Sequence, residues 1–350
     1  MKDKILMKGN EALAEAAVLA GCRHYFGYPI TPQNEIGAYM SMRMPKVGGT
    51  FLQAESEVAA INMVYGAAGA GKRAMTSSSS PGVSLKTEGI SYIAGADLPA
   101  LIVNVQRGGP GLGGIQPSQA DYFQAVKGGG HGDYKMIVLA PSSVQEMADL
   151  TVKGFGLADK YRMPVMILAD GALGQMMEPV SLDYPAQKVY EKPWALTGTK
   201  GARVHNIVNS LYLEPEELEK QILARFERYK AVQENEVEYE EYLTDDAEIC
   251  VVGYGISARV ARSAVNDARA KGIKAGLLRP ITLWPFPEKA VKKIADKVKA
   301  FIVAELSMGQ MVEDVRLYSE SKKPVHFCGR TGGMILTPNE VLQAIEKVNK

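Results

Sequence analysis

The chain of 350 residues is 46% hydrophobic and 23% charged, with a formal net charge of +1. This composition is typical of a soluble globular protein, and the length is sufficient for two domains. The near-neutral charge argues against nucleic-acid and membrane-surface partners, because both favour a basic excess. The sequence lacks the roughly 18 unbroken apolar residues of a membrane span, and its first residues lack the apolar core of a signal peptide. We therefore expect a cytoplasmic protein.

The first half of the chain alternates between helical and strand-like patterns. In chain order, the periodicity predicts helix 11–20, strand 25–28, helix 58–70, strand 74–77, helix 85–94, strands 100–105 and 135–139, helix 144–161 and strand 164–168. Strands that alternate with helices predict a parallel sheet covered on both faces.

The alternation stops near residues 181–200, and acidic residues then accumulate. Eight of the fifteen residues at 234–248 are acidic, which indicates a solvated connector. A second α/β unit begins with strand 249–253. We therefore predict a first domain at 1–190, a helical and acidic connector at 191–244, and a second domain at 245–350.

The second unit opens with a glycine turn, G-Y-G-I-S-A at 253–258. The turn is an incomplete dinucleotide fingerprint, because Ala258 stands at the third glycine position. An ordinary strand-to-helix turn is the alternative interpretation.

Cysteine and histidine are too sparse to suggest a metal centre. Cys22, Cys250 and Cys328 are far apart and form no C-x-x-C pair, and the chain has four histidines. This spacing argues against a disulfide framework and against an iron–sulfur or zinc site within the chain. We expect three reduced thiols.

Loops rich in glycine and hydroxyl side chains follow the predicted strands of the first domain. Their sequences are YPITPQ at 28–33, TSSSSPG at 76–82, QRGGPGLGG at 106–114 and KGGGHGD at 127–133. Open parallel sheets bind ligands at the carboxyl ends of their strands. Glycine there lets backbone N–H groups approach an anion or a flat ligand. We expect the binding site at this edge of the sheet.

Two loop residues are candidates for substrate binding. Arg107 has no acidic neighbour in its loop, and Asp97 should lie at the opposite end of the preceding strand. An unpaired guanidinium suits a substrate carboxylate, with an ordinary surface arginine as the alternative. Thr31 stands between two prolines that could aim its hydroxyl. The alternative is a rigid helix entry with Pro32 at the first helical position.

Glu57 is a carboxylate at the start of a helix of small and apolar residues. The next acidic residue along the chain is Glu88. An acid near a helix N-terminus can simply complement the helix dipole. A desolvated carboxyl in this position could instead share a proton with a ligand.

Taken together, YPITP, ESEVAA…YGAAGAG, TSSSSPG, QRGGPG and PVMILADG resemble the α subunit of the 2-oxoacid:ferredoxin oxidoreductases. Within that family the likeness is greatest to the branched-chain member, which acts on 2-oxoisovalerate (3-methyl-2-oxobutanoate). Residues 1–190 are similar to a thiamine pyrimidine-binding domain. The segments RPITLWPFP and FIVAELSMGQMVEDV resemble a transketolase C-terminal-like domain. The implied fold is a parallel-sheet α/β domain followed by a second, smaller α/β domain.

The resemblance implies roles for five residues. Glu57 would hydrogen-bond N1′ of the thiamine diphosphate aminopyrimidine and so promote deprotonation of thiazolium C2. Tyr28 and Pro29 would contact the cofactor. Thr31 and Arg107 would lie beside the carboxylate and keto group of the substrate.

The implied reaction is oxidative decarboxylation of a 2-oxoacid to acyl-CoA and carbon dioxide, with electrons passed to ferredoxin. The chain lacks a G-D-G…N segment for Mg²⁺ and diphosphate, and it lacks a cysteine cluster. The resemblance therefore implies a β subunit that carries diphosphate and Mg²⁺, and γ and δ (ferredoxin-like) subunits. The [4Fe-4S] clusters would lie on partner subunits, coenzyme A would be a co-substrate, and the chain alone would be inactive.

Several alternatives remain open at the level of sequence. The substrate could be 2-oxoglutarate or, third in order, pyruvate, and Lys127 or His131 could bind a second carboxylate. The chain could also be a non-catalytic scaffold, although Glu57, Thr31 and Arg107 argue against that interpretation. A nucleotide-binding protein that uses the G-Y-G-I-S-A turn is the remaining alternative.

Overall fold

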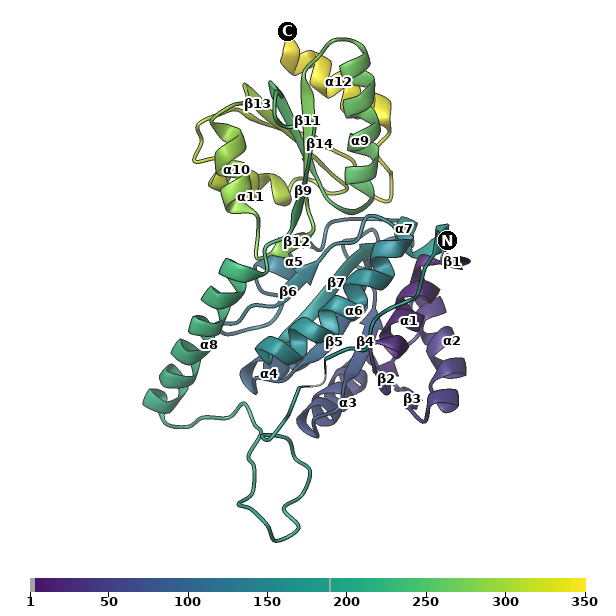
Figure 1. The fold of residues 1–350 in the computed structure, drawn as a ribbon, viewed down its shortest axis with the longest axis vertical. Helices are drawn as coiled ribbons and strands as arrows, with labels where there is room; N and C mark the ends of the chain where they lie inside the picture. Colours follow the sequence, from purple (N-terminus) through teal and green to yellow (C-terminus); the bar gives the residue numbers. More distant parts are fainter. Residues whose placement is uncertain (1–3, 189) are drawn as a thin grey trace.

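The computed structural model describes residues 4–188 and 190–350. These residues form two α/β bodies stacked along the long axis of the molecule, the N-terminal body being the larger (Figure 1). A seven-stranded sheet lies in the N-terminal body and a five-stranded sheet in the C-terminal body. The mixed α/β class with parallel sheets is the class that the sequence predicted.

The first sheet has the strand order β12-β6-β7-β5-β4-β2-β3, and only β12 runs antiparallel to its neighbour. Strands β4, β5 and β7 are buried along their whole length, as expected for a parallel sheet covered on both faces. The strands are β2 (His24–Gly27), β3 (Thr50–Gln53), β4 (Ala74–Ser78), β5 (Ala100–Gln106), β6 (Ile137–Leu139), β7 (Pro164–Asp170) and β12 (Thr282–Trp284).

Helices cover both faces of this sheet. One face carries α1 (Gly9–Leu19), α2 (Asn34–Arg43) and α6 (Val144–Tyr161), whereas the other carries α3 (Glu57–Gly69) and α4 (Ser80–Gly95). Short elements complete the body: β1 (Ile5–Lys8), which pairs with β8 (Met177–Val180), the 3-10 helix Pro45–Val47, α5 (Tyr122–Val126) and α7 (Gly171–Gln175).

The predicted helices and strands of this body are all present, and α6 has the predicted bounds. The largest error concerns α4, which begins five residues before the predicted start. Its first turn contains Pro81, and proline is favourable there because the first helical N–H groups have no partner within the helix. The serine-rich loop is therefore shorter than predicted, and its last residues form the helix N-terminus.

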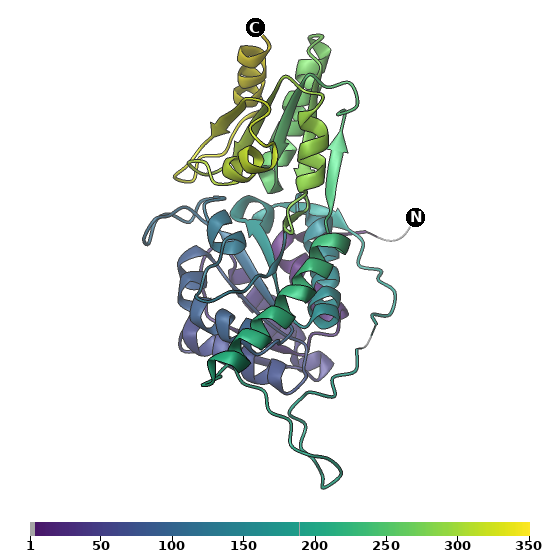
Figure 2. The same cartoon turned by 90° about the vertical axis from the view of Figure 1, so that its left-hand side faces the viewer.

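The chain between the two bodies contributes helices and strands to both of them. After residues 181–188 and 190–214, which form no helix or strand, α8 (Pro215–Asn235) lies along the N-terminal body (Figure 2). Strand β9 (Tyr239–Tyr242) then pairs with β11 (Ala275–Pro280) of the second sheet, and β12 returns to pair with β6 of the first. The acidic stretch at 234–248 thus contains an edge strand, not only a solvated connector.

The C-terminal sheet has the strand order β14-β13-β10-β11-β9. One face carries α9 and α12, and the other carries α10 and α11. The remaining bounds are β10 (Ile249–Gly253), α9 (Gly255–Ala270), α10 (Glu288–Ala295), β13 (Ala300–Glu305), α11 (Met311–Tyr318), β14 (Val325–Gly329) and α12 (Pro338–Asn349).

The G-Y-G-I-S-A turn is a contact between the two bodies. The Asp170 carboxylate, at the end of β7, accepts a hydrogen bond from the Ile256 N–H in the first turn of α9 (3.3 Å). The Gln119 side chain bonds the Tyr254 carbonyl (2.9 Å) and the Ser257 hydroxyl (2.7 Å). Burial raises the pKa of Asp170 to about 6. The N-terminus of α9 is therefore occupied by a carboxylate of the protein itself, which favours the interpretation as an ordinary turn.

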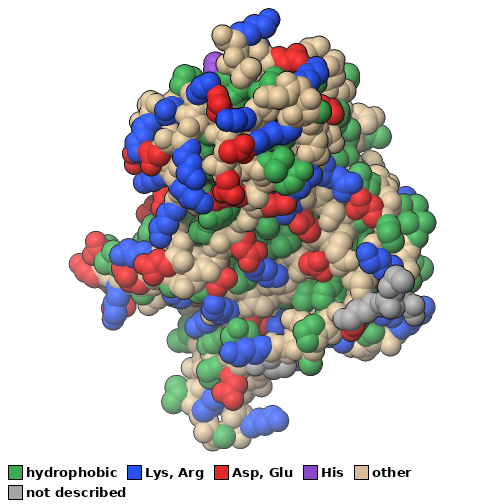
Figure 3. All heavy atoms as spheres, turned by 45° about the horizontal axis from the view of Figure 1, so that its top comes forward, with side chains coloured by type: hydrophobic (Ala, Val, Ile, Leu, Met, Phe, Trp, Pro, Cys, Tyr) green, Lys and Arg blue, Asp and Glu red, His purple; other side chains and the backbone are tan. Residues whose placement is uncertain are grey.

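The distribution of surface charge and the state of the cysteines agree with what the composition predicted. Basic and acidic side chains are interspersed over the face of the molecule in Figure 3. The three cysteines are free, as predicted, and burial raises the pKa of Cys22 and of Cys250 to about 12. In the described part of the chain, none of the helices combines the length and the apolar character needed to cross a bilayer.

Candidate active site

A pocket of about 420 Å³ lies at the carboxyl ends of β2 and β5, next to the first turns of α3 and α4. All five of the site residues predicted from the sequence line it: Tyr28, Pro29, Thr31, Glu57 and Arg107. The rest of the wall is formed by Ile30, Asn34, Pro81, Gly82, Leu85 and Leu112. Residues from the loops after β2 and β5 and from the first turns of α2, α3 and α4 thus meet at the edge of the sheet where open parallel sheets bind ligands.

Glu57 is the first residue of α3, but it does not cap that helix. The hydroxyl of Ser56 accepts a hydrogen bond from the Ala59 N–H (3.2 Å) and so provides the cap. The Glu57 side chain is buried at 6% exposure and lies against α4 at the wall of the pocket. The carboxylate is therefore available to a ligand.

Gly82 allows this approach of α4 to Glu57. A methyl group at Gly82 would lie 2.6 Å from Glu57 Oε1 and would overlap Ser78 Oγ. About two helical turns further along the same face of α4, a methyl group at Gly89 would lie 2.5 Å from Ile61 of α3. The two helices thus pack at glycine positions, and this packing sets the place of the carboxylate.

Arg107 follows β5 and is buried at 7% exposure. Its guanidinium donates to the carbonyls of Thr31 (2.9 Å) and Leu112 (3.1 Å), while its Nε has no partner among the described residues. Asp97 lies at the other end of β5, as predicted, and pairs with Arg225 (2.8 Å). Arg107 therefore carries a positive charge into the pocket, and no carboxylate among the described residues forms a salt bridge with it.

Thr31 is held by its neighbours in the loop that follows β2. Its hydroxyl accepts a hydrogen bond from the Asn34 side chain (3.2 Å), and its carbonyl accepts one from Arg107. Helix α2 begins at Asn34, so the alternative that placed Pro32 at the first helical position is wrong. The loop enters the pocket before the helix starts.

The N-terminus of α4 is fixed by polar residues that the sequence analysis did not select. The Ser80 hydroxyl donates to Asp121 (2.6 Å) and accepts from the Arg107 N–H (3.0 Å). Asn104 bonds the Ser80 N–H (3.2 Å) and Asp121 (2.9 Å), and burial raises the pKa of Asp121. This network connects the loop of Arg107 to the first turn of α4.

Lys86 is a further residue that the sequence analysis missed. Its side chain is fully buried, and its Nζ donates to Thr76 Oγ1 (2.6 Å) and to the Ser77 carbonyl (3.1 Å). Burial lowers the pKa of Lys86 to about 7, and attraction to Glu57 opposes that shift. Its position four residues after Gly82, on the buried face of α4, was the available sequence signal.

The buried Lys86 should make stability depend on pH. In the unfolded chain its pKa returns to the ordinary value of 10.5, so the unfolded state binds more protons above pH 7. We expect the free energy of unfolding to rise by up to about 1.4 kcal/mol per pH unit from pH 7 to about 8.5, below the titration of unfolded cysteines. Urea unfolding of the full chain measures this, with Lys86→Met as the variant that should lack the rise. Equal slopes in both proteins would contradict it.

Lys127 and His131, considered for a second substrate carboxylate, do not line the pocket. Lys127 forms a salt bridge with Asp314 of α11, at the contact between the bodies. His131 lies near the Ser91 hydroxyl (3.4 Å) and against the ring of Tyr92. Arg107 is therefore the only cationic side chain among the described residues that line the pocket.

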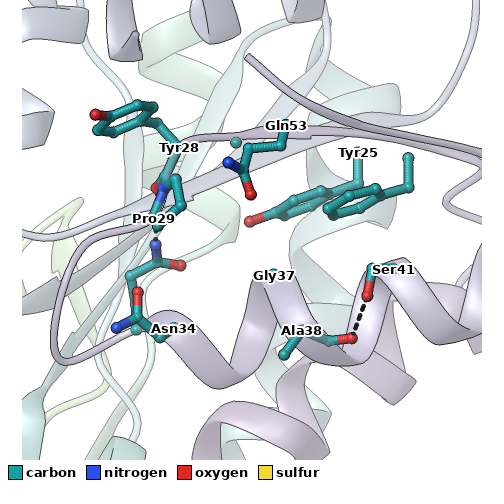
Figure 4. Close-up of a pocket in the computed structure, with 11 residues that line it drawn as sticks. Tyr25, Tyr28, Pro29, Asn34, Gly37, Ala38, Ser41 and Gln53 are labelled. Carbon is teal, nitrogen blue, oxygen red and sulfur yellow. Dashed lines mark hydrogen bonds between the residues drawn. The ribbon is translucent and has the colours of Figure 1, made fainter. Parts of the chain in front are cut away.

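A neighbouring pocket of about 310 Å³ lies between α2 and β3 (Figure 4). It shares Tyr28, Pro29 and Asn34 with the pocket of Glu57. Its inner wall includes the ring of Tyr25, stacked on Phe51 at 5.6 Å. The Tyr28–Pro29 segment therefore forms a wall of both pockets.

Two family models match the chain. Residues 15–249 match the thiamine diphosphate-binding domain of pyruvate flavodoxin/ferredoxin oxidoreductases. Residues 247–341 match the core domain II of pyruvate:ferredoxin oxidoreductase. The first match covers more than half of the chain and includes every residue of the pocket.

Curated relatives align over nearly the whole chain. Ketoisovalerate oxidoreductase subunit VorB of Methanothermobacter thermautotrophicus is 56% identical, over 98% of this chain and 97% of its own length. The 2-oxoglutarate synthase subunit KorA of the same organism is 37% identical, over 100% of both chains.

Solved structures show the same fold. The 2-oxoglutarate:ferredoxin oxidoreductase of Magnetococcus marinus, solved with 2-oxoglutarate, coenzyme A and succinyl-CoA, has a TM-score of 0.89 at 30% identity. The match covers 100% of this chain and 66% of that one. A split-gene transketolase has a TM-score of 0.61 at 16% identity, which is a likeness of fold alone. By its family-model matches and full-length relatives, the chain belongs to the 2-oxoacid:ferredoxin oxidoreductases, as an α-type subunit.

Proposed function

We propose that this subunit serves the oxidative decarboxylation of branched-chain 2-oxoacids of the 2-oxoisovalerate type to acyl-CoA and carbon dioxide, with electrons passed to ferredoxin. The chemical character of the pocket is the observation that carries the proposal. Its wall combines one carboxylate and one guanidinium with apolar side chains from Ile30, Leu85 and Leu112. An apolar side chain on the substrate fits such a wall, whereas a second carboxylate would need a second cation.

The relatives support this choice of substrate. The two VorB relatives, at 55–56% identity, are named for ketoisovalerate, and the four archaeal KorA relatives, at 36–38%, are named for 2-oxoglutarate. Lys127, which could have bound a second carboxylate, is engaged with Asp314. We therefore rank 2-oxoglutarate second.

The pocket fits the aminopyrimidine of thiamine diphosphate. The buried Glu57 carboxylate faces the pocket, and Gly82 leaves room beside it. In the proposed role Glu57 shares a proton with N1′, and Tyr28 and Pro29 contact the ring. When bound, the cofactor supplies the electron sink for decarboxylation. Arg107 binds the substrate carboxylate, and Thr31 lies beside it.

The rim of the pocket favours a partner subunit over solvent. Three of the side chains that line the pocket are large, apolar and exposed, namely Tyr28, Leu85 and Leu112. Exposed apolar groups gathered at one site typically mark a protein interface. We propose that a β subunit covers this rim and carries the diphosphate and Mg²⁺, and that γ and δ subunits carry [4Fe-4S] clusters that reduce ferredoxin.

The substrate assignment is tested on the reconstituted complex. Reduction of a viologen dye is measured with 2-oxoisovalerate, 2-oxoglutarate and pyruvate, in the presence of coenzyme A. We expect the highest kcat/KM with 2-oxoisovalerate. A preference for 2-oxoglutarate would show that the partner subunit supplies the missing cation. No turnover of any 2-oxoacid would instead favour a scaffold.

Gly82→Ala should impair the cofactor site without removing any catalytic group. The added methyl group overlaps Ser78 Oγ and presses on Glu57 Oε1, so the carboxylate must move. Displacement of a reacting group by about 1 Å can reduce rates by roughly 100-fold. We expect a loss of this order in kcat. Gly66→Ala is the matched control, because the helical position Gly66 has open space around it. Equal activities of the two variants would contradict the prediction.

A further inference from the structure

We infer that Asp121 is a positioning residue for Arg107, and that it transmits the placement of the C-terminal body to the pocket. This inference rests on the proposed function, in which Arg107 binds the substrate carboxylate. Asp121 does not line the pocket. It acts on the backbone of Arg107 through Ser80 and not on the substrate.

The Ser80 hydroxyl joins Asp121 to the backbone of Arg107. It accepts a hydrogen bond from the Arg107 N–H (3.0 Å) and donates one to the Asp121 carboxylate (2.6 Å). Because a hydroxyl has one proton, the bond to the carboxylate turns an oxygen lone pair towards the Arg107 N–H. The Arg107 carbonyl lies 3.2 Å from the same hydroxyl and would accept that proton if the carboxylate were removed. Asp121 therefore fixes the direction in which the hydroxyl donates.

Asp121 is itself held at the end of β5. Its carboxylate accepts a second hydrogen bond from the Asn104 side chain (2.9 Å), and its N–H donates to Gln106 Oε1 (3.1 Å). Both partners belong to β5, the strand that Arg107 follows. An isolated β-bridge pairs Arg107 with Pro117. The segment from Pro117 to Asp121 therefore supports the backbone of Arg107.

The C-terminal body binds the chain immediately before and after Asp121. The side chain of Gln310, at the start of α11, donates to the Ala120 carbonyl (2.7 Å) and accepts from the Phe123 N–H (2.8 Å). Helix α5 begins directly after Asp121, at the boundary between the two bodies (Figure 1). Gln310 therefore fixes the backbone on both sides of the Asp121 carboxylate.

Gln119 makes further contacts of this kind with the C-terminal body. Its N–H donates to the Leu306 carbonyl (2.8 Å), and its side chain accepts from the Leu306 N–H (3.0 Å). The same side chain also bonds Tyr254 and Ser257. Gln119 is completely buried, so its replacement would leave several buried polar groups unpaired. Gln310 is partly exposed and is therefore the better residue for an experiment.

These contacts give the C-terminal body an influence on a pocket to which it contributes no side chain among the described residues. A guanidinium that binds a carboxylate through two parallel hydrogen bonds requires an accurate position. A shift of the segment that carries Asp121 should displace Arg107. Glu57 begins a different helix, α3, and should keep its place.

The first test is a double-mutant cycle on the kcat/KM of the reconstituted complex with 2-oxoisovalerate. Asp121→Ala should reduce kcat/KM by roughly 100-fold, the effect of displacing a binding group by about 1 Å. In the Arg107→Ala background the same substitution should cost about twofold at most, because the group that it positions is gone. Asp121→Asn keeps an oxygen that can accept from Ser80, so it should retain most of the activity. Equal losses from Asp121→Ala in both backgrounds would overturn the inference.

A second variant leaves Asp121 in place and covers the case in which Asp121→Ala does not assemble. Gln310→Met keeps the size of the side chain but loses both hydrogen bonds, and we expect a loss of roughly 10-fold that again disappears in the Arg107→Ala background. Gln145→Met is the matched control. Gln145 of α6 also bonds the N–H and the carbonyl of one segment, those of Ser181 (2.9 Å each), and it does not line the pocket. An activity of Gln310→Met equal to that of the control would overturn the inference.

Deprotonation at C2 of bound thiamine diphosphate separates the effect on Arg107 from an effect on Glu57. We expect hydrogen–deuterium exchange at C2 to proceed in Asp121→Ala and in Gln310→Met at the wild-type rate. Slowed exchange would show that Asp121 acts through α4 on Glu57 and would overturn the inference. An unchanged kcat/KM in Arg107→Ala alone would instead refute the proposed role of Arg107, and the inference with it.

Discussion

Replacement of Glu57 by glutamine should slow deprotonation at C2 of bound thiamine diphosphate by roughly 10²–10⁴-fold, the range for a positioned acid–base group. Glutamine keeps the shape of the side chain but cannot exchange a proton with N1′. The complex should still assemble, because Ser56 and not Glu57 caps α3. The measurement is hydrogen–deuterium exchange at C2 in the reconstituted complex, read by NMR after acid quenching.

Glu55→Gln is the matched control for this experiment. Glu55 lies two residues earlier and is exposed, so the same chemical change occurs outside the pocket. We expect wild-type exchange in this variant. An exchange rate in Glu57→Gln equal to that of the control would remove Glu57 from the proton transfer, although the pocket would remain.

Replacement of Arg107 by alanine should reduce kcat/KM by roughly 30- to 1000-fold, equivalent to about 2–4 kcal/mol of lost transition-state binding. The guanidinium is buried, has no carboxylate partner among the described residues and lines the pocket. Since every 2-oxoacid carries the same carboxylate, the loss should be similar for substrates with different side chains. The affinity for thiamine diphosphate should barely change.

Two variants separate charge from structure at Arg107. Arg107→Lys keeps the charge but not the two-pronged geometry, so its activity should lie between those of wild type and alanine variant. Arg203→Ala is a control for lost backbone contacts, because Arg203 also donates to carbonyls, those of Val204 and Gly198, in a distant loop. Unchanged kcat/KM in Arg107→Ala would exclude Arg107 from the site. A loss confined to one substrate would show that Arg107 recognises the side chain of that substrate instead of the shared carboxylate.

The local elements of this protein could be predicted because they depend on the periodicity of nearby residues. Helix α6 has an apolar stripe long enough to specify its ends, and its Ser143 cap is visible in the sequence. Strands β5 and β7 appear as short, mostly apolar runs bounded by turns. The start of α4 was misjudged because serine, proline and glycine are typical both of loops and of helix N-termini.

The pocket could be predicted in outline for a topological reason. Parallel strands end at one edge of a sheet, so the loops that carry Thr31 and Arg107 had to lie near each other. Glu57 required the family resemblance as well, because an acid at a helix start has an ordinary electrostatic explanation. The structure then brought these side chains to one cavity.

The sequence by itself determined the α/β class, most of the elements and the edge of the sheet that carries the pocket, because these follow from local periodicity and strand direction. Only the tertiary structure decided the pairing of β12 with β6, the pairing of Lys127 with Asp314 and the burial of Lys86 against β4. Each of these contacts joins residues of different helices, strands or loops. The spacing of Lys86 from Gly82 indicates the face of α4 on which it lies, but only the packing of that face against β4 buries the side chain and supplies its hydrogen-bond acceptors.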